Sequence, residues 1–263
     1  MSNDYGDIVY TTEGGLAWIV INRPERYNAF RAMTIEELIH AMKRAWADPE
    51  IGVVALRGAG EKAFCTGGDQ KQRAETGDYG PTSNGLFEVE AFHRLIREIP
   101  KPVIAAVNGF AIGGGHVIHL LCDLTVAADH ARFGQTGPKV GSFDAGFGTA
   151  YMARILGEKR AREVWYTCRQ YDAATMRQWG MVNEVVPIAD LDDAVRSLAG
   201  EMLDKSPTAL RVCKASFNAA SDHIGGIASM AFTSLDLFVD TDEAKEGVRA
   251  FNEKRSPDFG AYR

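Results

Sequence analysis

Hydrophobic and polar positions alternate near the start of the chain in two short segments. Residues 8–12 and 16–22 are rich in β-branched and aromatic side chains, and Gly14 and Gly15 stand between them. This pattern predicts a β-hairpin. Residues 51–56 form a continuous apolar run, which is typical of a strand that is buried on both faces.

Helical and strand patterns then alternate through the next part of the chain. Thr34 followed by Glu36 and Glu37 predicts a helix start, with apolar positions at helical spacing behind it. The elements predicted further along are a helix over 86–99, a strand over 102–107, a helix over 113–122 and a strand over 123–128. Such alternation predicts a layered α/β core with right-handed crossovers.

Strand patterns end near residue 189, and only helical patterns follow. The predicted C-terminal helices cover residues 191–203, 208–220, 223–239 and 241–254. We therefore divide the chain into an α/β core over residues 1–190, where we expect the functional site, and a helical region over residues 191–263. Apolar positions of that region, such as Ile227 and Met230, need a partner surface, either the core or a neighbouring subunit.

Composition and charge narrow the class of protein. The chain has 263 residues, of which 46% are apolar and 24% charged, and its net charge is −6; this is the composition of a globular protein. No cluster of Lys and Arg interrupts the acidic balance, so neither nucleic acid nor an anionic membrane is an expected partner. The longest apolar stretch, residues 102–122, is broken by Asn108, glycines and histidines and should not span a bilayer.

The N-terminus and the cysteines favour a reducing cytoplasm. Residues 1–7 are polar and acidic and lack the apolar segment of a signal peptide. The four cysteines are widely scattered and form no CxxC pair, so we expect free thiols.

One helix carries residues that could be mistaken for metal ligands. His116, His119 and Cys122 follow one another at intervals of three, but their neighbours are apolar and no further ligand follows at a suitable spacing. We interpret the histidines as core or interface residues and expect no metal. The sequence also lacks the nucleophile elbow, phosphate-loop and HExxH motifs.

Three glycine-rich clusters are the strongest chemical signal in the chain. Residues 64–70 follow a predicted buried strand, within a long polar loop over 58–85, and residues 108–115 end at a helix start. Backbone N–H groups bared by glycine at such places could form an oxyanion hole for a thioester or ester carbonyl, although both clusters could also be plain turns. The third cluster, residues 133–148, brings Ser142 and Asp144 close together, unless Asp144 serves only as a helix cap.

Taken together, the three clusters resemble the crotonase (enoyl-CoA hydratase/isomerase) superfamily, over essentially the whole chain. The resemblance implies a spiral of repeated β-β-α units and an all-helical C-terminal oligomerisation region. It also implies an acyl-CoA substrate, with the thioester oxygen bound by the N–H groups of Gly68 and Gly114. A homotrimer or a dimer of trimers is the implied assembly.

The two glutamates used by the hydratases of this superfamily are missing. One should stand three residues after the middle glycine of the second cluster, where this chain has Val117. The other should stand four residues after Phe133, where this chain has Gly137. Simple hydration of an enoyl-CoA is therefore not the expected reaction.

Longer segments resemble the 1,4-dihydroxy-2-naphthoyl-CoA synthases of menaquinone biosynthesis. The segments are residues 67–71, 113–117, 134–144, 161–165 and 253–259. The resemblance implies a Claisen-type ring closure with loss of water, in which bicarbonate replaces a carboxylate as the base. By the same resemblance, bicarbonate would be held by Gln135, Thr136, Gly137 and Trp165, while Ser142 and Asp144 would handle protons.

Other features resemble 2-ketocyclohexanecarboxyl-CoA hydrolase, which adds water to a cyclic β-ketone and opens the ring. The loop after the first cluster is about four residues shorter than in the synthases and offers only Tyr79, and Val239 replaces a second tyrosine near the C-terminus. The hydrolase therefore remains an alternative to the synthase. A non-catalytic acyl-CoA-binding relic is a third, but the joint presence of Gly68, Gly114, Ser142 and Asp144 argues against it.

The resemblance also implies a set of residues that contact coenzyme A or the acyl group. They are Arg26, Thr66, Gly67, Asp69, Gln70, Lys71, Tyr79, Phe110, Ala111, Ile112, Gly113 and, from a neighbouring subunit, Lys254. From the sequence alone, Lys71 and Lys254 would pass for ordinary surface charges.

Overall fold

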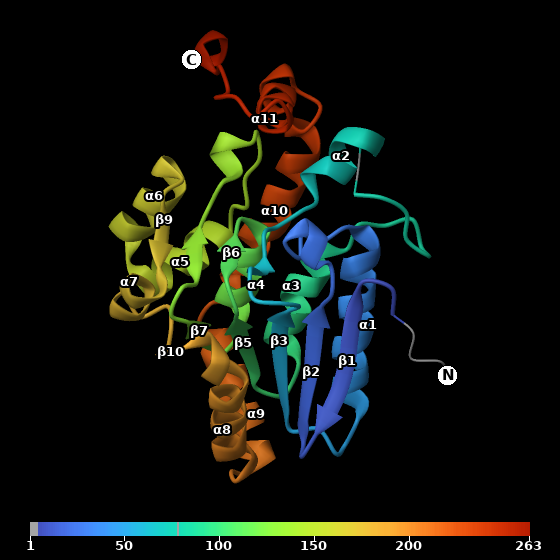
Figure 1. The fold of residues 1–263 in the computed structure, drawn as a ribbon, viewed down its shortest axis with the longest axis vertical. Coiled ribbons are helices and arrows are strands. Elements are labelled where there is room, and N and C mark those ends of the chain that lie inside the picture. The colour runs from blue at the N-terminus through green and yellow to red at the C-terminus, as the bar shows by residue number, and fades with distance from the viewer. Residues whose placement is uncertain (1–4, 78) are drawn as a thin grey trace.

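The computed structural model describes residues 5–77 and 79–263. Residues 1–4, which belong to the polar N-terminus considered above, and Asp78 lie outside the described residues. Two sheets form the centre of the molecule, with helices on their faces and a helical C-terminal region (Figure 1). No described helix is long and apolar enough to cross a membrane.

The larger sheet has six strands in the order β1-β2-β3-β5-β7-β10. Their bounds are β1 Ile8–Glu13, β2 Leu16–Ile21, β3 Val53–Gly58, β5 Val103–Val107, β7 Leu124–Ala128 and β10 Glu184–Val186. β1 and β2 form the predicted hairpin, closed between Glu13 and Leu16, and all later neighbours are parallel. Gly14 and Gly15 both have positive φ angles in its turn, which glycine adopts without strain.

The smaller sheet has the order β4-β6-β8-β9. Its strands are β4 Ala63–Cys65, β6 Phe110–Ile112, β8 Arg132–Gly134 and β9 Gln170–Asp172. Each of its first three strands directly follows a strand of the larger sheet, so the pairs β3-β4, β5-β6 and β7-β8 repeat as the chain spirals. This repetition confirms the predicted spiral of β-β-α units.

Eleven α-helices cover the sheets or extend from them in the described residues. They are α1 Ala32–Ala47, α2 Gln70–Thr76, α3 Val89–Glu98, α4 Gly114–Leu121, α5 Met152–Leu156, α6 Glu158–Thr167, α7 Ala173–Gln178, α8 Leu191–Leu203, α9 Pro207–Ala219, α10 His223–Phe238 and α11 Asp242–Asn252. Alternate residues of β2 serve the two faces: Ile19 and Ile21 pack in the core with α1 and α3, whereas Trp18 packs in the core under α8. The period of two in this strand thus builds both layers.

The C-terminal helices α10 and α11 pack on the core of their own chain. A Cβ at Gly146 would lie 2.7 Å from the backbone of Ala228 in α10, and one at Gly141 would lie 2.5 Å from the Ala244 carbonyl oxygen in α11. Such close approach of backbones is open only to glycine. The predicted need of this region for a partner surface is therefore met in part within the chain, and α11 also contacts α2 (Figure 1).

Several local predictions were wrong in detail. The segment 58–85, expected as one loop, contains β4 and α2, and the helix expected over 86–99 begins at Val89. The short strands β6, β8, β9 and β10 were not predicted. These strands have three residues each, which is too short to show a period in the sequence.

Candidate active site

The first two glycine clusters lie side by side where β4 and β6 end. Gly67 has a φ of +84°, and a Cβ there would lie 3.0 Å from the Gly114 nitrogen. A Cβ at Gly115 would lie 1.9 Å from the Cys65 carbonyl oxygen. The backbones of the two clusters can therefore approach this closely only with glycine at these positions. A tight turn alone would not require this contact between the clusters.

The peptide planes of both clusters are fixed from one side. The Gly67 carbonyl accepts a 2.8 Å hydrogen bond from Phe30 N–H, and the Gly113 carbonyl accepts one of 3.1 Å from Val117 N–H in the first turn of α4. In a trans peptide the N–H points opposite to the C=O. The N–H groups of Gly68 and Gly114 therefore point away from these partners, and no described residue accepts a hydrogen bond from either.

Two such fixed and unpaired N–H groups form an oxyanion hole in chemical terms. They lie next to each other, and the N-terminus of α4 adds its partial positive charge. A carbonyl oxygen that becomes negative during a reaction gains most from donors that need no reorientation. This is the arrangement that the roles implied for Gly68 and Gly114 would require.

The third cluster lies beside the second. Gly113 N–H donates to the Gly134 carbonyl at 2.9 Å, and the Thr136 hydroxyl lies 3.4 Å from where a Cβ of Gly113 would stand. The chain then passes through η2 Gly137–Lys139 to Asp144 and to the π-helical turn η3 Phe147–Tyr151, which packs against α4. The order of the three clusters in space follows their order in the chain.

Asp144 has the chemistry of an acid–base group. One of its oxygens accepts a 3.2 Å hydrogen bond from Gly148 N–H in the turn η3, although the N-cap residue of that turn is Gly146. Burial nevertheless raises the pKa of this carboxyl to about 7, and it outweighs the Gly148 hydrogen bond, which acts in the opposite direction. A carboxyl group with that pKa is present in both protonation states near neutral pH and can donate or accept a proton. The hydrogen bond to the turn and the chemical role are therefore compatible.

The two positions at which hydratases carry their glutamates are both tightly surrounded by other residues of this chain. Val117 is fully buried in the core. A Cβ at Gly137 would lie 2.7 Å from the Ser142 carbonyl oxygen and 3.1 Å from the Trp165 ring. The backbone around Gly137 therefore leaves no room for a side chain without a shift of residues 142 and 165.

The residues that the resemblance implies for binding bicarbonate differ in whether their hydrogen-bond donors already have a partner. Gln135 is 1% exposed, and its amide nitrogen has no hydrogen-bond partner among the described residues. Trp165 instead donates its indole N–H to the Gly148 carbonyl at 2.5 Å. Because this is the only hydrogen-bond donor of the indole, Trp165 could contribute to an anion site in this structure only through its apolar ring.

Three aromatic rings cover the first cluster. Tyr79 stacks on Phe87 with ring centroids 4.6 Å apart, and Phe30 lies 6.5 Å from Tyr79 and 6.2 Å from Phe87. A Cβ at Gly68 would lie 2.5 Å from the Tyr79 ring. Tyr79 therefore lies at the site as expected, whereas Phe30 and Phe87 were missed because nothing in the sequence marks isolated phenylalanines as site residues.

The residues expected to contact coenzyme A fall into two groups. Thr66 and Phe110 lie on the outside of the first two clusters beside Tyr27, which the sequence did not suggest: the Thr66 hydroxyl donates to the Tyr27 carbonyl, and the rings of Tyr27 and Phe110 meet edge to face. By contrast, Ala111 is 0% and Ile112 6% exposed in β6. Their side chains belong to the core, so only their backbone can serve a ligand.

The remaining residues expected to contact coenzyme A lie near the start of α2 or after the end of α11. Asp69 is buried and caps α2, and Gln70 donates its side-chain amide to the Gly68 carbonyl at 3.2 Å. Arg26 lies close enough to lower the pKa of Asp69. Lys71 is exposed and lies 4.0 Å from Glu75, and Lys254 is exposed beyond the end of α11.

His116 and His119 lie in the core, as predicted. Their rings stack with centroids 4.9 Å apart beside Phe133, and both are at most 1% exposed. Burial lowers the pKa of His116 to about 4, and burial together with the neighbouring His116 holds the pKa of His119 well below its usual value. The described residues contain no group of three or more His, Cys, Asp or Glu that could hold a metal ion.

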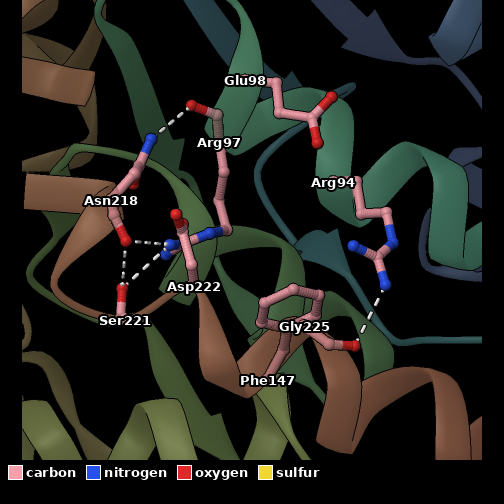
Figure 2. Close-up of a pocket in the computed structure, with 8 residues that line it drawn as sticks. All are labelled: Arg94, Arg97, Glu98, Phe147, Asn218, Ser221, Asp222 and Gly225. Atoms are coloured by element: carbon pink, nitrogen blue, oxygen red, sulfur yellow. Dashed lines mark hydrogen bonds between the residues drawn. The ribbon is translucent and has the colours of Figure 1, made fainter.

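A small cavity beyond Phe147 lies outside this site. Figure 2 shows it between α3 and the start of α10, with Arg97 reaching across it to the Asn218 carbonyl and the Ser221 hydroxyl. Arg97 also lies over the Phe147 ring, 5.7 Å from its centroid. These contacts join α3 to the C-terminal region and hold Phe147, which follows Asp144 by three residues.

Comparison with known proteins decides the family. Residues 11–262 match the family model described as enoyl-CoA hydratase/isomerase. The chain belongs to this family. It is an acyl-CoA-processing enzyme of the crotonase superfamily, with the fold predicted for it.

Solved structures of other family members share the whole fold. A crystal structure of an enoyl-CoA hydratase from Mycobacterium avium subsp. paratuberculosis K-10 is 27% identical, with a TM-score of 0.87 over 97% of this chain and 99% of that one. A carnitinyl-CoA hydratase from Mycobacterium avium is 32% identical, with a TM-score of 0.85 over 97% and 98%. An enoyl-CoA hydratase from Bacillus anthracis is 30% identical, with a TM-score of 0.76 over 96% and 98%.

Proposed function

We propose that the protein makes a carbon–carbon bond in an aryl keto-acid CoA thioester, by a ring closure like that of 1,4-dihydroxy-2-naphthoyl-CoA synthase. The observation that carries the proposal is the pairing of an intact oxyanion hole with Asp144, whose pKa is about 7, at a site without either hydratase glutamate. Gly68 and Gly114 would stabilise the enolate that forms when the carbon next to the thioester loses a proton.

Asp144 would supply the proton that completes the new bond. The enolate carbon attacks the second carbonyl, whose oxygen takes up a proton from Asp144 as the carbon–carbon bond forms, and water is lost afterwards. Near pH 7 a large share of Asp144 is protonated and ready for this role. Ser142, whose N–H is tied to the Gly137 carbonyl at 2.9 Å, stands two residues away and would hold the same end of the substrate.

Bicarbonate is the base that we propose for removal of the first proton. The unpartnered and buried amide of Gln135 can donate to an anion, as can the neighbouring Thr136 hydroxyl. When bound there, bicarbonate would accept the proton that a side-chain carboxylate accepts in other members. Trp165 would contribute an apolar wall and hold the Gly148 carbonyl, rather than donate to the anion.

The relatives with solved structures are named hydratases, which makes hydration the first reaction to exclude by experiment. Val117 and Gly137 argue against it, because neither residue has a carboxylate that could activate water, and a side chain at position 137 would meet the Ser142 backbone. The reasoning predicts that crotonyl-CoA gains no water with this enzyme.

A ring-opening hydrolase of a cyclic β-keto acyl-CoA is the alternative. One observation favours it: Phe238, next to Val239, packs its ring 5.6 Å from that of Phe143, so the end of α10 lies at the third cluster without the phenol of the synthases. In that reaction Asp144 would act as a base on water. The ratio kcat/KM would then rise with pH through about 7, whereas it would fall if Asp144 is the acid of the synthase.

The assembly and the location are also proposals. Met230 and Leu237 are 65% and 76% exposed on α10, which supports association of subunits, and we propose a trimer or a dimer of trimers with Lys254 reaching coenzyme A of a neighbour. We also propose that the enzyme works in the cytoplasm, as its scattered cysteines suggest. An enzyme that stays a monomer in light scattering would contradict this role of Lys254.

Mass spectrometry of the CoA product tests the function. The enzyme is offered o-succinylbenzoyl-CoA, 2-oxocyclohexanecarboxyl-CoA and crotonyl-CoA in separate reactions, with and without bicarbonate. Loss of water from the first, dependent on bicarbonate, is the expected result. Gain of water by the second would establish the hydrolase, and gain of water by crotonyl-CoA would overturn the argument from Val117 and Gly137.

A further inference from the structure

A buried cluster of charges lies directly behind the Gly68 donor. Arg23, Asp69 and Asp7 are 8%, 5% and 3% exposed, although they come from the end of β2, the start of α2 and the start of β1. Arg23 Nη2 donates to Asp69 Oδ2 at 2.8 Å, and its Nε lies 3.7 Å from Asp7 Oδ2. Burying charged side chains costs free energy unless they are paired, and a turn at the start of α2 could form without them.

Arg23 holds both sides of the contact that orients the Gly68 peptide. That contact is an isolated parallel bridge, in which Phe30 N–H donates to the Gly67 carbonyl and Asp69 N–H donates to the Phe30 carbonyl, each at 2.8 Å. On one side of the bridge, Arg23 Nη1 donates to the Ala29 carbonyl. On the other side, Arg23 Nη2 holds the Asp69 carboxylate, which itself accepts from the N–H groups at the start of α2.

We propose that Arg23 is a positioning residue that fixes the Gly68 N–H of the oxyanion hole by clamping residues 29–30 to residues 68–69. The planar guanidinium is suited to this, because its donors leave in two fixed directions at once. The proposal rests on the oxyanion hole of the proposed function and adds a residue that touches no substrate.

The rest of the cluster keeps Arg23 itself in place. Arg31 binds Asp7 with two donors, at 2.8 and 2.9 Å, and Thr34 donates its hydroxyl to the same carboxylate at 2.5 Å. Asn28 accepts from Arg23 N–H at 3.0 Å and donates to the Ala63 carbonyl of β4. The guanidinium is therefore anchored to the hairpin, to α1 and to the strand that leads into the first cluster.

Charge balance is a second effect of the same residue. Burial alone would raise the pKa of Asp69, but the Gln72 backbone N–H and the Arg23 guanidinium hold it below its usual value. Asp69 is therefore an anion one residue from a donor that must attract an enolate. Without Arg23 that anion would repel the negative charge which the hole has to bind.

The test measures the polarisation of a bound carbonyl. Benzoyl-CoA labelled with ¹³C at the thioester carbonyl is the probe, because it has no hydrogen on the adjacent carbon and cannot form an enolate. Isotope-edited infrared difference spectra give the shift of the carbonyl stretch to lower frequency on binding to the wild-type enzyme. The double variant R23Q/D69N removes both charges together and leaves two amides that can still pair, so the fold has no unpaired buried ion.

We expect R23Q/D69N to lose about half or more of the wild-type shift and to lower kcat by about 10- to 100-fold, with a much smaller change in KM. Arg23→Lys, which keeps the charge but not the planar fork, should recover part of the shift. Asp123→Asn is the control: it breaks the 2.7 Å ion pair between the buried Lys214 and the more exposed Asp123, far from the hole in the fold, and should leave the shift unchanged.

The outcomes separate this inference from the proposed function. A full wild-type shift in R23Q/D69N, with only a lower melting temperature, would show that Arg23 is merely structural and overturn the inference. The absence of any shift in the wild-type enzyme saturated with benzoyl-CoA would instead refute the oxyanion hole itself.

Discussion

Asp144→Asn should make the enzyme more stable and nearly inactive. The pKa of Asp144 in the folded protein is about 7 because of burial, whereas a carboxyl in an unfolded chain titrates near 3.8. As pH rises from 4 to 7, the unfolded state therefore loses its proton before the native state does. Wild-type stability falls over this window and stays reduced above it.

The magnitude follows from the difference between the two pKa values. About three units at ~1.4 kcal/mol each give an upper bound of about 4 kcal/mol, and Asn avoids this cost because it carries no charge. The variant should thus gain up to that amount over wild type at pH 8 and almost nothing at pH 4. Its turnover should fall by about 10²- to 10⁴-fold, because a positioned proton donor is lost.

Urea unfolding at pH 8 and pH 4, followed by circular dichroism at matched protein concentration, measures the stability difference. Asp172→Asn is the control with the opposite sign, since the Thr175 N–H lowers the pKa of Asp172 at the start of α7. That variant should lose stability at pH 8. Equal stability of Asp144→Asn and wild type at both pH values would refute the account of burial, and unchanged turnover would refute the catalytic role.

Three further predictions concern the same region and the core. Gly137→Ala should lower the free energy of unfolding by about 1–3 kcal/mol in thermal denaturation, because its Cβ would meet backbone; a neutral result would reopen this position to a side chain. Gln135→Met should abolish the dependence of turnover on bicarbonate. Trp165→Phe should keep that dependence but lower the free energy of unfolding by about 1–3 kcal/mol, because the hydrogen bond to the Gly148 carbonyl is lost. The reverse pattern would show that the anion binds at Trp165 and not at Gln135. The pKa values of His93 and His116 are lowered by burial to about 4, so their stabilising contribution is complete above pH 6.5 and is lost as pH falls towards 4, about 3 kcal/mol each at most. His93→Phe should reduce this acid sensitivity in urea unfolding, and an unchanged pH profile would contradict it.

The elements that are long enough to show a hydrophobic period, or that carry a glycine signal, could be predicted from the sequence. The hairpin around Gly14 and Gly15, the helix α4 and the four C-terminal helices each have a clear period or a glycine signal. The short strands β6, β8, β9 and β10 could not be found in this way, since three residues in a sheet are fixed by their neighbours and not by their own pattern.

The site could be predicted only where backbone conformation dictates the residue. The first two glycine clusters were visible because glycine leaves backbone N–H groups bare after a strand and at a helix start. Gly68 and Gly114 as the donors, and the proton-transfer role of Asp144, were implied only by the family resemblance. Arg23 and Phe87 were missed, because their partners lie about 46 residues away in one case and across a loop in the other. The hydrogen bond from the Trp165 indole to the Gly148 carbonyl could not be foreseen for the same reason, since the two residues become neighbours only after folding.

The close packing of α10 and α11 on Gly146 and Gly141 has a consequence for folding during synthesis on the ribosome. The loop with Ser142 and Asp144 is held by segments about 100 residues later in the chain, such as Ala228 and Ala244. The oxyanion hole can form while the nascent chain is still being made, since both of its strands come early. The acid–base loop must wait for the last helices to leave the exit tunnel, so a chain released early would bind a thioester before it could transform one.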